Sequence, residues 1–340
     1  MLDYSSPYPG VSVVTPSPEF FDLLADGPIA DLDRVMDEPD AVAHSLGADL
    51  LARLPAAIRA AVSRSSTYEA DPIILFKGLP IDGELPPTPT DGVNNPRALP
   101  RSVTTMLTMA GSLGLSLIAY RTMLNWAWIR SISPTAGHTE KRGSYGSRRS
   151  LPLHSEVSQA GLPGETGTGV SPSPDYLVLY CLRNNERAPT TFCLIPEVLE
   201  RLPEQAVAAL RRPEFSIAGG DSFAPSNVLE DVALLRTCPR TGGLQFRYNG
   251  TGIKPQTPAA AEALELLEEM FRDPALVRSV ILEPGDMLLL ENRRTVHGRD
   301  PFEPRFDGTD RWLLRLYTVN QSTFSEGVAE DPALPNLWYV

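Results

Sequence analysis

The feature that most constrains the fold is a series of short strand-like runs in the second half of the chain. From Ser150 onward, apolar segments alternate with turn residues: LPLHSEV, DYLVLYCLR, TTFCLI, VALLRTC, LQFRYN, VRSVILEP, GDMLLLEN and DRWLLRLYTV. The 33 prolines fall mostly between periodic segments, which is typical of short elements joined by turns. Eight such runs suit a double-sheet jelly roll. We therefore predict a mainly β protein with flanking helices around a double-stranded β-helix (jelly-roll) core.

Helical patterns flank these runs. Ser17-Pro18-Glu19 opens a turn, and apolar residues then recur at three- to four-residue spacing, which predicts a helical layer over residues 1–70. The apolar, β-branched run DPIILFKGLPID predicts a buried strand. Further helices are expected over 97–113, 195–212 and 258–272, and one or two strands over 118–134.

These patterns predict one domain. The jelly-roll core is expected over residues 71–320, followed by an extended tail over 321–340. Residues 159–174 are rich in Gly, Ser, Thr and Pro and interrupt the core strands directly after a candidate site. A loop of this length in this position is more often a lid than a linker, so we expect a mobile lid there.

Charge and composition exclude several classes of protein. With 42 acidic and 30 basic residues the formal charge is −12. Such a charge disfavours binding to nucleic acid or to an anionic membrane surface. No stretch approaches the roughly 18 apolar residues that a membrane helix needs, and the N-terminus lacks a signal-peptide pattern. We expect a soluble, cytoplasmic protein. Its three cysteines lack CxxC spacing and are expected to be reduced, mostly buried thiols.

A metal site can be sought among very few histidines. The chain has four: His44, His138, His154 and His297. His154 and Glu156 lie two apart on a strand-like run, where a period of two puts both side chains on one face. The other His-x-acid pair, His138 and Glu140, has no flanking apolar alternation and is predicted to lie in a solvated loop. His44 is predicted to be a helix-surface histidine.

A third ligand and a cosubstrate partner are expected from the C-terminal block. A turn and a buried strand lead to His297, and Arg311 follows fourteen residues later. Two histidines and one carboxylate form the facial triad of non-haem Fe(II) oxygenases, which leaves three positions for a chelating cosubstrate and O2. A guanidinium on the last strand can hold the distal carboxylate of 2-oxoglutarate bidentately.

This ordered set resembles a known family. The His154-x-Glu156 motif, the HGR tripeptide at His297, the DGTDRW segment and the upstream ILFKGLPID are similar to the clavaminate synthase-like group of Fe(II)/2-oxoglutarate oxygenases. That group includes asparagine oxygenase and arginine β-hydroxylases of peptide-antibiotic pathways. The resemblance covers roughly Asp71 to Thr318, and residues 285–317 are its most specific part.

The resemblance implies roles for individual residues. His154, Glu156 and His297 match the iron ligands, and Arg311 with Thr191 matches the 2-oxoglutarate site. The matches for substrate binding are Arg315, which lies on the face of Arg311, the Gly143–Ser147 segment with Ser144 and Ser147, and Asn249.

The sequence also departs from the family. Gln159 to Pro174 forms an apparent insertion, and Asn249 stands where relatives often carry aspartate. A neutral amide there favours a substrate with an uncharged side chain over arginine.

The expected activity is hydroxylation of an unactivated C–H bond in a free amino acid or a small derivative, in secondary, antibiotic-type metabolism. Fe(II), 2-oxoglutarate and O2 are the expected cofactor and cosubstrates, and the oligomeric state stays open. Desaturation or oxidative cyclisation by the same iron centre is an alternative, and so is a non-catalytic jelly-roll binding protein. Halogenation would need a small residue in place of Glu156, which argues against it.

Overall fold

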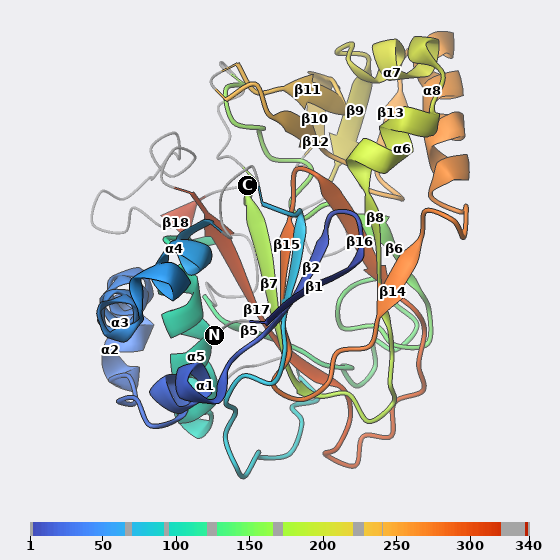
Figure 1. Ribbon diagram of the computed structural model, residues 1–340. Helices are drawn as coiled ribbons and strands as arrows, with labels where there is room; N and C mark the ends of the chain where they lie inside the picture. Colours follow the sequence, from blue (N-terminus) through green and yellow to red (C-terminus); the bar gives the residue numbers. More distant parts are fainter. Residues whose placement is uncertain are drawn as a thin grey trace.

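The computed structural model describes residues 3–64, 70–91, 95–120, 128–165, 173–219, 228–239, 241–320 and 337–338. In this part of the chain, two β-sheets lie beside each other, with the N-terminal helices against one of them and a smaller layer above the other (Figure 1).

The larger sheet has nine described strands. Eight run in the order β1-β2-β3-β15-β7-β17-β4-β18, and β5 pairs with β17. Their bounds are Asp3–Tyr8 (β1), Val11–Thr15 (β2), Ile73–Phe76 (β3), Ser116–Tyr120 (β4), Arg130–Ile132 (β5), Tyr176–Arg183 (β7), Met287–Glu291 (β15), Trp312–Val319 (β17) and Leu337–Trp338 (β18).

The smaller sheet carries the strands that matter most for the candidate site. Its order is β14-β8-β16-β6, with bounds Arg278–Val280 (β14), Thr190–Leu194 (β8), Thr295–Arg299 (β16) and Leu151–His154 (β6). Phe192 and Leu194 of β8 share one apolar cluster with Leu177 and Leu179 of β7. The interior between the two sheets is therefore a packed core.

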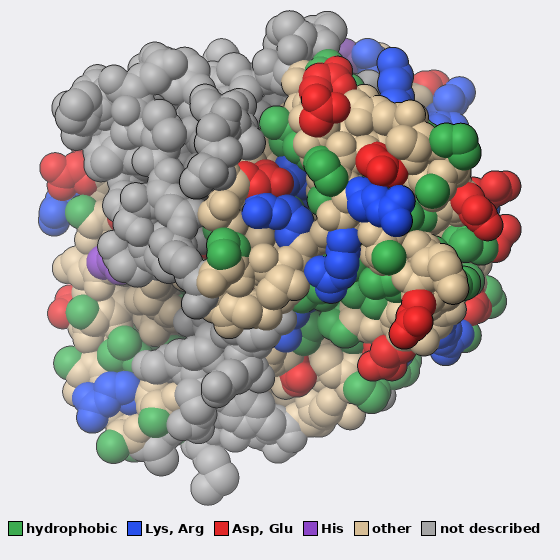
Figure 2. All heavy atoms as spheres, turned by 90° about the horizontal axis from the view of Figure 1, so that it is seen from above, with side chains coloured by type: hydrophobic (Ala, Val, Ile, Leu, Met, Phe, Trp, Pro, Cys, Tyr) green, Lys and Arg blue, Asp and Glu red, His purple; other side chains and the backbone are tan. Residues whose placement is uncertain are grey.

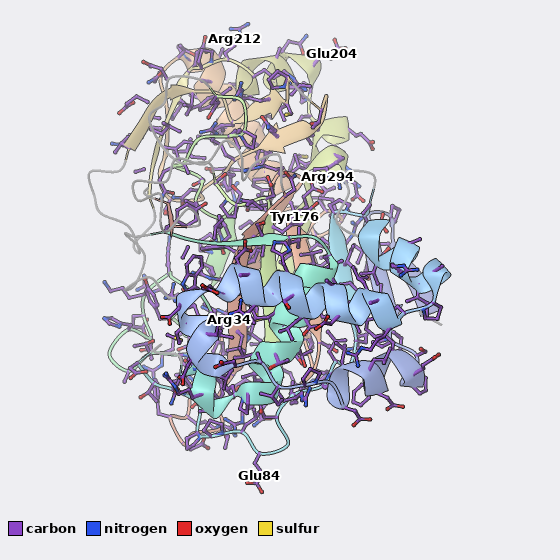
Figure 3. The ribbon with its side chains drawn as sticks, turned by 90° about the vertical axis from the view of Figure 1, so that its left-hand side faces the viewer. Arg34, Glu84, Tyr176, Glu204, Arg212 and Arg294 are labelled. Atoms are coloured by element: carbon purple, nitrogen blue, oxygen red, sulfur yellow. The ribbon has the colours of Figure 1, made fainter. Side chains whose placement is uncertain are left out.

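The N-terminal helices cover the outer face of the larger sheet (Figure 3). They are α1 (Pro18–Ala25), α2 (Leu32–Asp37), α3 (Pro39–Arg53), α4 (Ala56–Arg64), the short 3-10 helix η1 (Pro96–Ala98) and α5 (Pro100–Ser112). The side chain of Ser17 accepts a hydrogen bond from the backbone N–H of Phe20 and caps α1. Helices α3 and α5 cross at Gly47 and Gly111, where a Cβ on Gly47 would lie 2.2 Å from the carbonyl carbon of Gly111. Glycine is therefore required at this crossing.

A third layer packs on the outer face of the smaller sheet. Cys193 and Val296 of that sheet belong to one apolar cluster with residues of this layer. The layer consists of α6 (Ile195–Arg201), α7 (Glu204–Leu210), α8 (Pro258–Met270), β9 (Phe215–Ala218), β10 (Val228–Val232), β11 (Leu235–Thr237), β12 (Leu244–Phe246) and β13 (Ile253–Pro255).

The main sequence predictions agree with this architecture. Each of the eight runs after Ser150 contains a strand, and helices occupy the ranges predicted around 97–113, 195–212 and 258–272. The helical layer does not begin at residue 1, because β1 and β2 form a hairpin that extends the larger sheet. Gly10, with φ at +74°, makes the turn between them. Of the predicted tail, Leu337–Trp338 pairs with β4, and residues 321–336 and 339–340 lie outside the described part.

Both described ends of the predicted lid pack against other segments. Ala160 and Leu162 are fully or almost fully buried, and the Nε2 of Gln245 donates to the carbonyl of Pro163 at 3.0 Å. At the other end, the side chain of Arg293 donates to the side chain and carbonyl of Ser173. The described ends are thus packed segments, and the mobile lid over 159–174 stays a prediction. Residues 166–172 lie outside the described part.

The surface is mixed in charge. On the described part of the face in Figure 2, acidic and basic side chains are interspersed. None of the helices in the described part has the length and apolar character that a bilayer crossing requires.

Candidate active site

The smaller sheet brings two of the four histidines together. His297 on β16 pairs directly with His154 at the end of β6, so both side chains point from the same face of the sheet. Their ring centroids lie 4.4 Å apart. Glu156 follows β6 by two residues, and its Oε1 lies 3.3 Å from Nε2 of His297 and 3.8 Å from Nε2 of His154. Ligand atoms of all three residues lie within 4.8 Å of one another.

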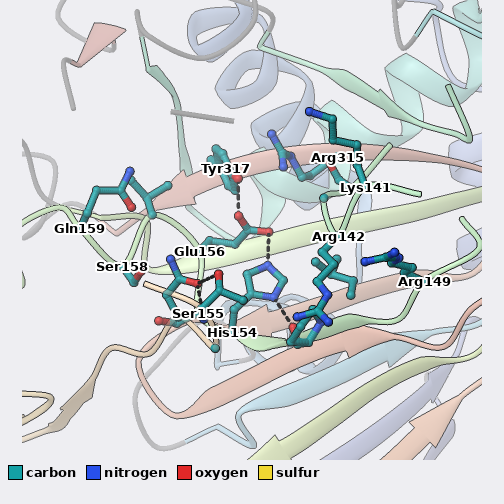
Figure 4. Close-up of a pocket in the computed structure, with 18 of the residues that line it drawn as sticks. Lys141, Arg142, Arg149, His154, Ser155, Glu156, Ser158, Gln159, Arg315 and Tyr317 are labelled. Carbon is teal, nitrogen blue, oxygen red and sulfur yellow. Dashed lines mark hydrogen bonds and ion pairs between the residues drawn. The ribbon is translucent and has the colours of Figure 1, made fainter. Parts of the chain in front are cut away.

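Two residues that the sequence analysis missed hold Glu156 in place. The hydroxyl of Tyr317 donates to Oε2 of Glu156, so Oε1 remains toward the histidines (Figure 4). The amide oxygen of Asn292 accepts from the backbone N–H of Glu156 at 2.7 Å, and its Nδ2 donates to the Glu156 carbonyl at 3.0 Å. The same Nδ2 also donates to the carbonyl of Pro174 at 2.9 Å. Both the side chain and the backbone of Glu156 are therefore fixed.

The electrostatics of the cluster favour a negative carboxylate beside two imidazoles. Burial opposes the charge of Glu156, but hydrogen bonds from His154 and His297 and the charge of Arg315 outweigh it and hold its pKa well below the usual range. Burial, followed by repulsion from His154, lowers the pKa of His297. For His154, burial is outweighed by the hydrogen bond and the charge of Glu156, so its pKa is raised.

The three side chains fit a divalent iron ion. Nδ1 of His154 lies 3.0 Å from the carbonyl oxygen of Pro152, which can only accept, so in the neutral imidazole Nδ1 carries the proton and Nε2 can offer its lone pair to a metal. Two imidazole nitrogens and one carboxylate oxygen on one side of an ion form the 2-His-1-carboxylate set of non-haem Fe(II) enzymes. In the described part of the chain, this is the group of histidine, cysteine and acidic side chains close enough to hold a metal.

The buried guanidinium of Arg311 lies beside Thr190, on the face of the smaller sheet that carries His297. Arg311 is 4% exposed, and its Nε has no hydrogen-bond partner. Burial lowers the pKa of Arg311 to about 10. Its Nη2 donates to the Oγ1 of Thr190 at 3.3 Å. Thr190 lies two residues from Phe192, the partner of His297, which places it about 7 Å along the sheet from the histidine.

The register corrects the predicted partner of Arg311 by one residue. Thr191 pairs with Gly298, and a Cβ on Gly298 would lie 3.0 Å from the Oγ1 of Thr191. Thr191 therefore points to the face opposite His297, whereas Thr190 points to the face of the candidate site. The threonine beside Arg311 is therefore Thr190 and not Thr191.

A cavity of about 380 Å³ opens beside His154. Glu156, Tyr317 and Arg315 also line it (Figure 4). Arg315 is 7% exposed, and its guanidinium carbon lies 4.2 Å from the ring centroid of Tyr317. As predicted, Arg311 and Arg315 face the same side of the last strand, since Leu313 between them packs in the interior cluster and Trp312 packs on the helical side.

The other residues predicted to contact the substrate do not all line the cavity. Ser144 lines the cavity, but Ser147 is fully buried and does not. Asn249 also lines the cavity, but its amide is held by protein groups: Nδ2 donates to the Ala218 carbonyl, and Oδ1 accepts from Thr251. Its predicted role in selecting a neutral side chain therefore has no direct geometric support.

The remaining histidines lie away from the cluster. His138 and Glu140 are exposed in a loop, and His44 is exposed on α3, as the sequence predicted. The three cysteines are free and buried, also as predicted.

The family model for the TauD/TfdA family (taurine catabolism dioxygenase TauD) matches residues 126–317, more than half of the chain. The chain belongs to this dioxygenase family. The jelly-roll fold class and the enzyme class predicted from the sequence are thereby confirmed.

Several relatives of this dioxygenase are characterised. L-asparagine oxygenase of Streptomyces coelicolor is 33% identical over 252 residues, 73% of this chain and 71% of the relative. Clavaminate synthase 2 of Streptomyces clavuligerus is 30% identical over 304 residues, 86% of each chain. A crystal structure of asparagine oxygenase with Fe(II), (2S,3S)-3-hydroxyasparagine and succinate superposes with a TM-score of 0.78 at 28% identity, covering 96% of this chain and 99% of that one. The resemblance stated from the sequence is confirmed.

Proposed function

We propose that this dioxygenase hydroxylates an unactivated C–H bond of a free amino acid or a small amino-acid derivative, and that the whole chain acts as one oxygenase domain. The observation that carries the proposal is the convergence of His154, Glu156 and His297 beside a cavity lined by the buried Arg315. The substrate class is supported by the relatives, which are named as oxygenases or hydroxylases of asparagine, lysine, and ornithine or arginine.

His154, Glu156 and His297 would hold the iron through Nε2, Oε1 and Nε2, respectively. Iron, 2-oxoglutarate and O2 together supply the oxidising power for C–H hydroxylation, with succinate and CO2 as co-products. Tyr317 and Asn292 keep the carboxylate of Glu156 turned toward the histidines. The asparagine oxygenase structure, which contains Fe(II) and succinate, supports this choice of metal and cosubstrate.

Arg311 and Thr190 would bind the distal carboxylate of 2-oxoglutarate. Arg311 has no ion-pair partner among the described residues, and its Nε lacks a hydrogen-bond partner. An unpaired buried cation is costly, and a bidentate carboxylate is its best-matched partner. The spacing of about 7 Å along the strand is suitable for a cosubstrate that reaches from the histidines to Arg311.

Arg315 would bind the carboxylate of the substrate in the cavity, and Ser144, which also lines the cavity, would contact another part of the substrate. This arrangement would orient the substrate next to the two histidines. Arg315 would act by binding and positioning and does not need to transfer a proton.

The test is a mass-spectrometric screen of the proteinogenic and common non-proteinogenic L-amino acids with Fe(II), 2-oxoglutarate and O2. A product heavier by one oxygen atom, formed with an equal amount of succinate, is expected. Loss of two hydrogen atoms would indicate desaturation or cyclisation. This is the second candidate reaction, because a clavaminate synthase is among the relatives. Absence of succinate release with every amino acid and O2 would contradict the proposal.

A further inference from the structure

Two buried arginines lie directly opposite each other in the larger sheet. Arg130 on β5 is the register partner of Arg315 on β17. Arg130 is 4% exposed and Arg315 is 7% exposed. Directly opposed side chains on one face are close neighbours, and two like charges in that position destabilise a sheet unless an anion lies between them.

The described residues do not supply that anion. In the described part of the chain, neither arginine has an acidic side chain within ion-pair distance, and Nε and Nη1 of Arg130 have no hydrogen-bond partner. Their close neighbours are aromatic: the guanidinium carbon of Arg130 lies 4.9 Å from the ring centroid of Tyr145, and that of Arg315 lies 4.2 Å from the centroid of Tyr317. The charge of Glu156 reaches Arg315, but this carboxylate faces the two histidines.

The guanidinium of Arg130 remains charged at neutral pH. Burial lowers the pKa of Arg130 to about 10, and repulsion from Arg315 contributes to that decrease. Two buried guanidiniums side by side, one of which lines the cavity, are suited to bind an anion.

We infer that Arg130 is a specificity-determining residue that, together with Arg315, binds one free carboxylate group of the substrate. A carboxylate has two oxygens and about four acceptor positions, so it can serve two guanidiniums at once. This inference rests on the proposed function and narrows its substrate class. An amide, ester or carrier-bound thioester lacks the second anionic oxygen and would leave one buried guanidinium unpaired. The enzyme should therefore act on free amino acids and reject carboxyl-blocked or carrier-tethered ones.

The test compares Arg130→Gln with Arg148→Gln, a surface control whose guanidinium pairs with Glu303. With the amino acid found in the screen, Arg130→Gln should raise the substrate KM about 10- to 100-fold, because a hydrogen bond to a charged group is lost. The KM for 2-oxoglutarate should stay unchanged, and so should both constants in Arg148→Gln. In Arg130→Gln, but not in Arg148→Gln, the preference for the free acid over its carboxamide should decrease by the same factor.

A second measurement separates this inference from the proposed function. Thermal unfolding of the Mn(II)- and 2-oxoglutarate-loaded protein is followed with each of the twenty proteinogenic L-amino acids and with its carboxamide. In the wild type, at least one free acid should raise the Tm while its carboxamide does not. Arg130→Gln should abolish this difference. The Tm of the variant without any amino acid should not be lower than that of the wild type. Hydroxylation with equal use of acids and carboxamides, or an unchanged KM in Arg130→Gln, would overturn the inference and leave the proposed function standing. If Arg130→Gln fails to fold, Arg130→Lys should fold and show an intermediate KM; a wild-type KM in Arg130→Lys would then overturn it.

Discussion

Tyr317 donates its hydroxyl hydrogen to Oε2 of Glu156, while Oε1 of the same carboxylate faces the Nε2 atoms of His154 and His297. The two residues come from distant parts of the chain, because Glu156 follows β6 and Tyr317 lies on β17 of the other sheet. The contact therefore links the two sheets at the candidate iron site and selects which carboxylate oxygen is presented to a metal.

Replacing Tyr317 by phenylalanine removes this hydrogen bond and keeps the ring. The carboxylate of Glu156 would then be free to rotate, and we expect divalent metal to bind about 10- to 100-fold more weakly, as is usual when a partner of a metal ligand is lost. Calorimetric titration with Mn(II) measures this directly. An unchanged dissociation constant would show that the bond does not orient the ligand.

Asn292→Ala should destabilise the fold as well as the metal site. The substitution leaves the partly buried N–H and carbonyl of Glu156 without their partner, so the free energy of unfolding in urea should decrease by about 1–3 kcal/mol. Asn185 is the control, because it is exposed and its side chain bonds only the carbonyl of Thr309 among the described contacts. Asn185→Ala should change the free energy by less than about 0.5 kcal/mol. Equal losses in both variants would contradict the role of Asn292.

The pair Thr190 and Thr191 tests the register of the smaller sheet. Arg311→Lys should raise the KM for 2-oxoglutarate about tenfold or more, because an ammonium cannot reproduce the bidentate contact. Thr190→Val removes the hydroxyl beside Arg311 and should raise the same constant a few-fold, whereas Thr191→Val faces the other side and should not. A larger effect for Thr191→Val would restore the assignment made from the sequence.

The cysteines should be unreactive in the folded protein. Burial raises the pKa of Cys181 and of Cys193 to about 12, so at pH 8 only about one thiol in 10⁴ is ionised. Since the thiolate is the reacting form, iodoacetamide at pH 8 should label neither residue until guanidinium chloride unfolds the chain. Rapid labelling of Cys193 in the native protein would contradict its burial.

Local patterns were sufficient for much of the fold and of the candidate metal site. The alternation Leu151, Leu153 placed His154 on a strand, and the HGR tripeptide marked His297. Both signals are contained in short segments. The hairpin of β1 and β2 carried a signal too, in the Pro9-Gly10 turn, but its first strand is polar and poor in the alternation that marks a buried strand.

The features that were missed depend on pairing between distant segments. Thr190 and Thr191 are chemically equal, and only the register with β16 decides which one faces Arg311. The opposition of Arg130 and Arg315 arises from the β5–β17 pairing, across 185 residues of sequence. In the same way, the Gly- and Pro-rich composition of 159–174 predicted a lid, but not the contact by which Gln245, from a distant segment, bonds the carbonyl of Pro163.

The central claim is that His154, Glu156 and His297 hold the iron of this dioxygenase. Anaerobic equilibrium dialysis against Fe(II), followed by elemental analysis, measures the iron bound per chain in the wild type, His154→Ala and His138→Ala. The account predicts one iron in the wild type and in His138→Ala, and none in His154→Ala. Retention of iron by His154→Ala together with its loss from His138→Ala would contradict it.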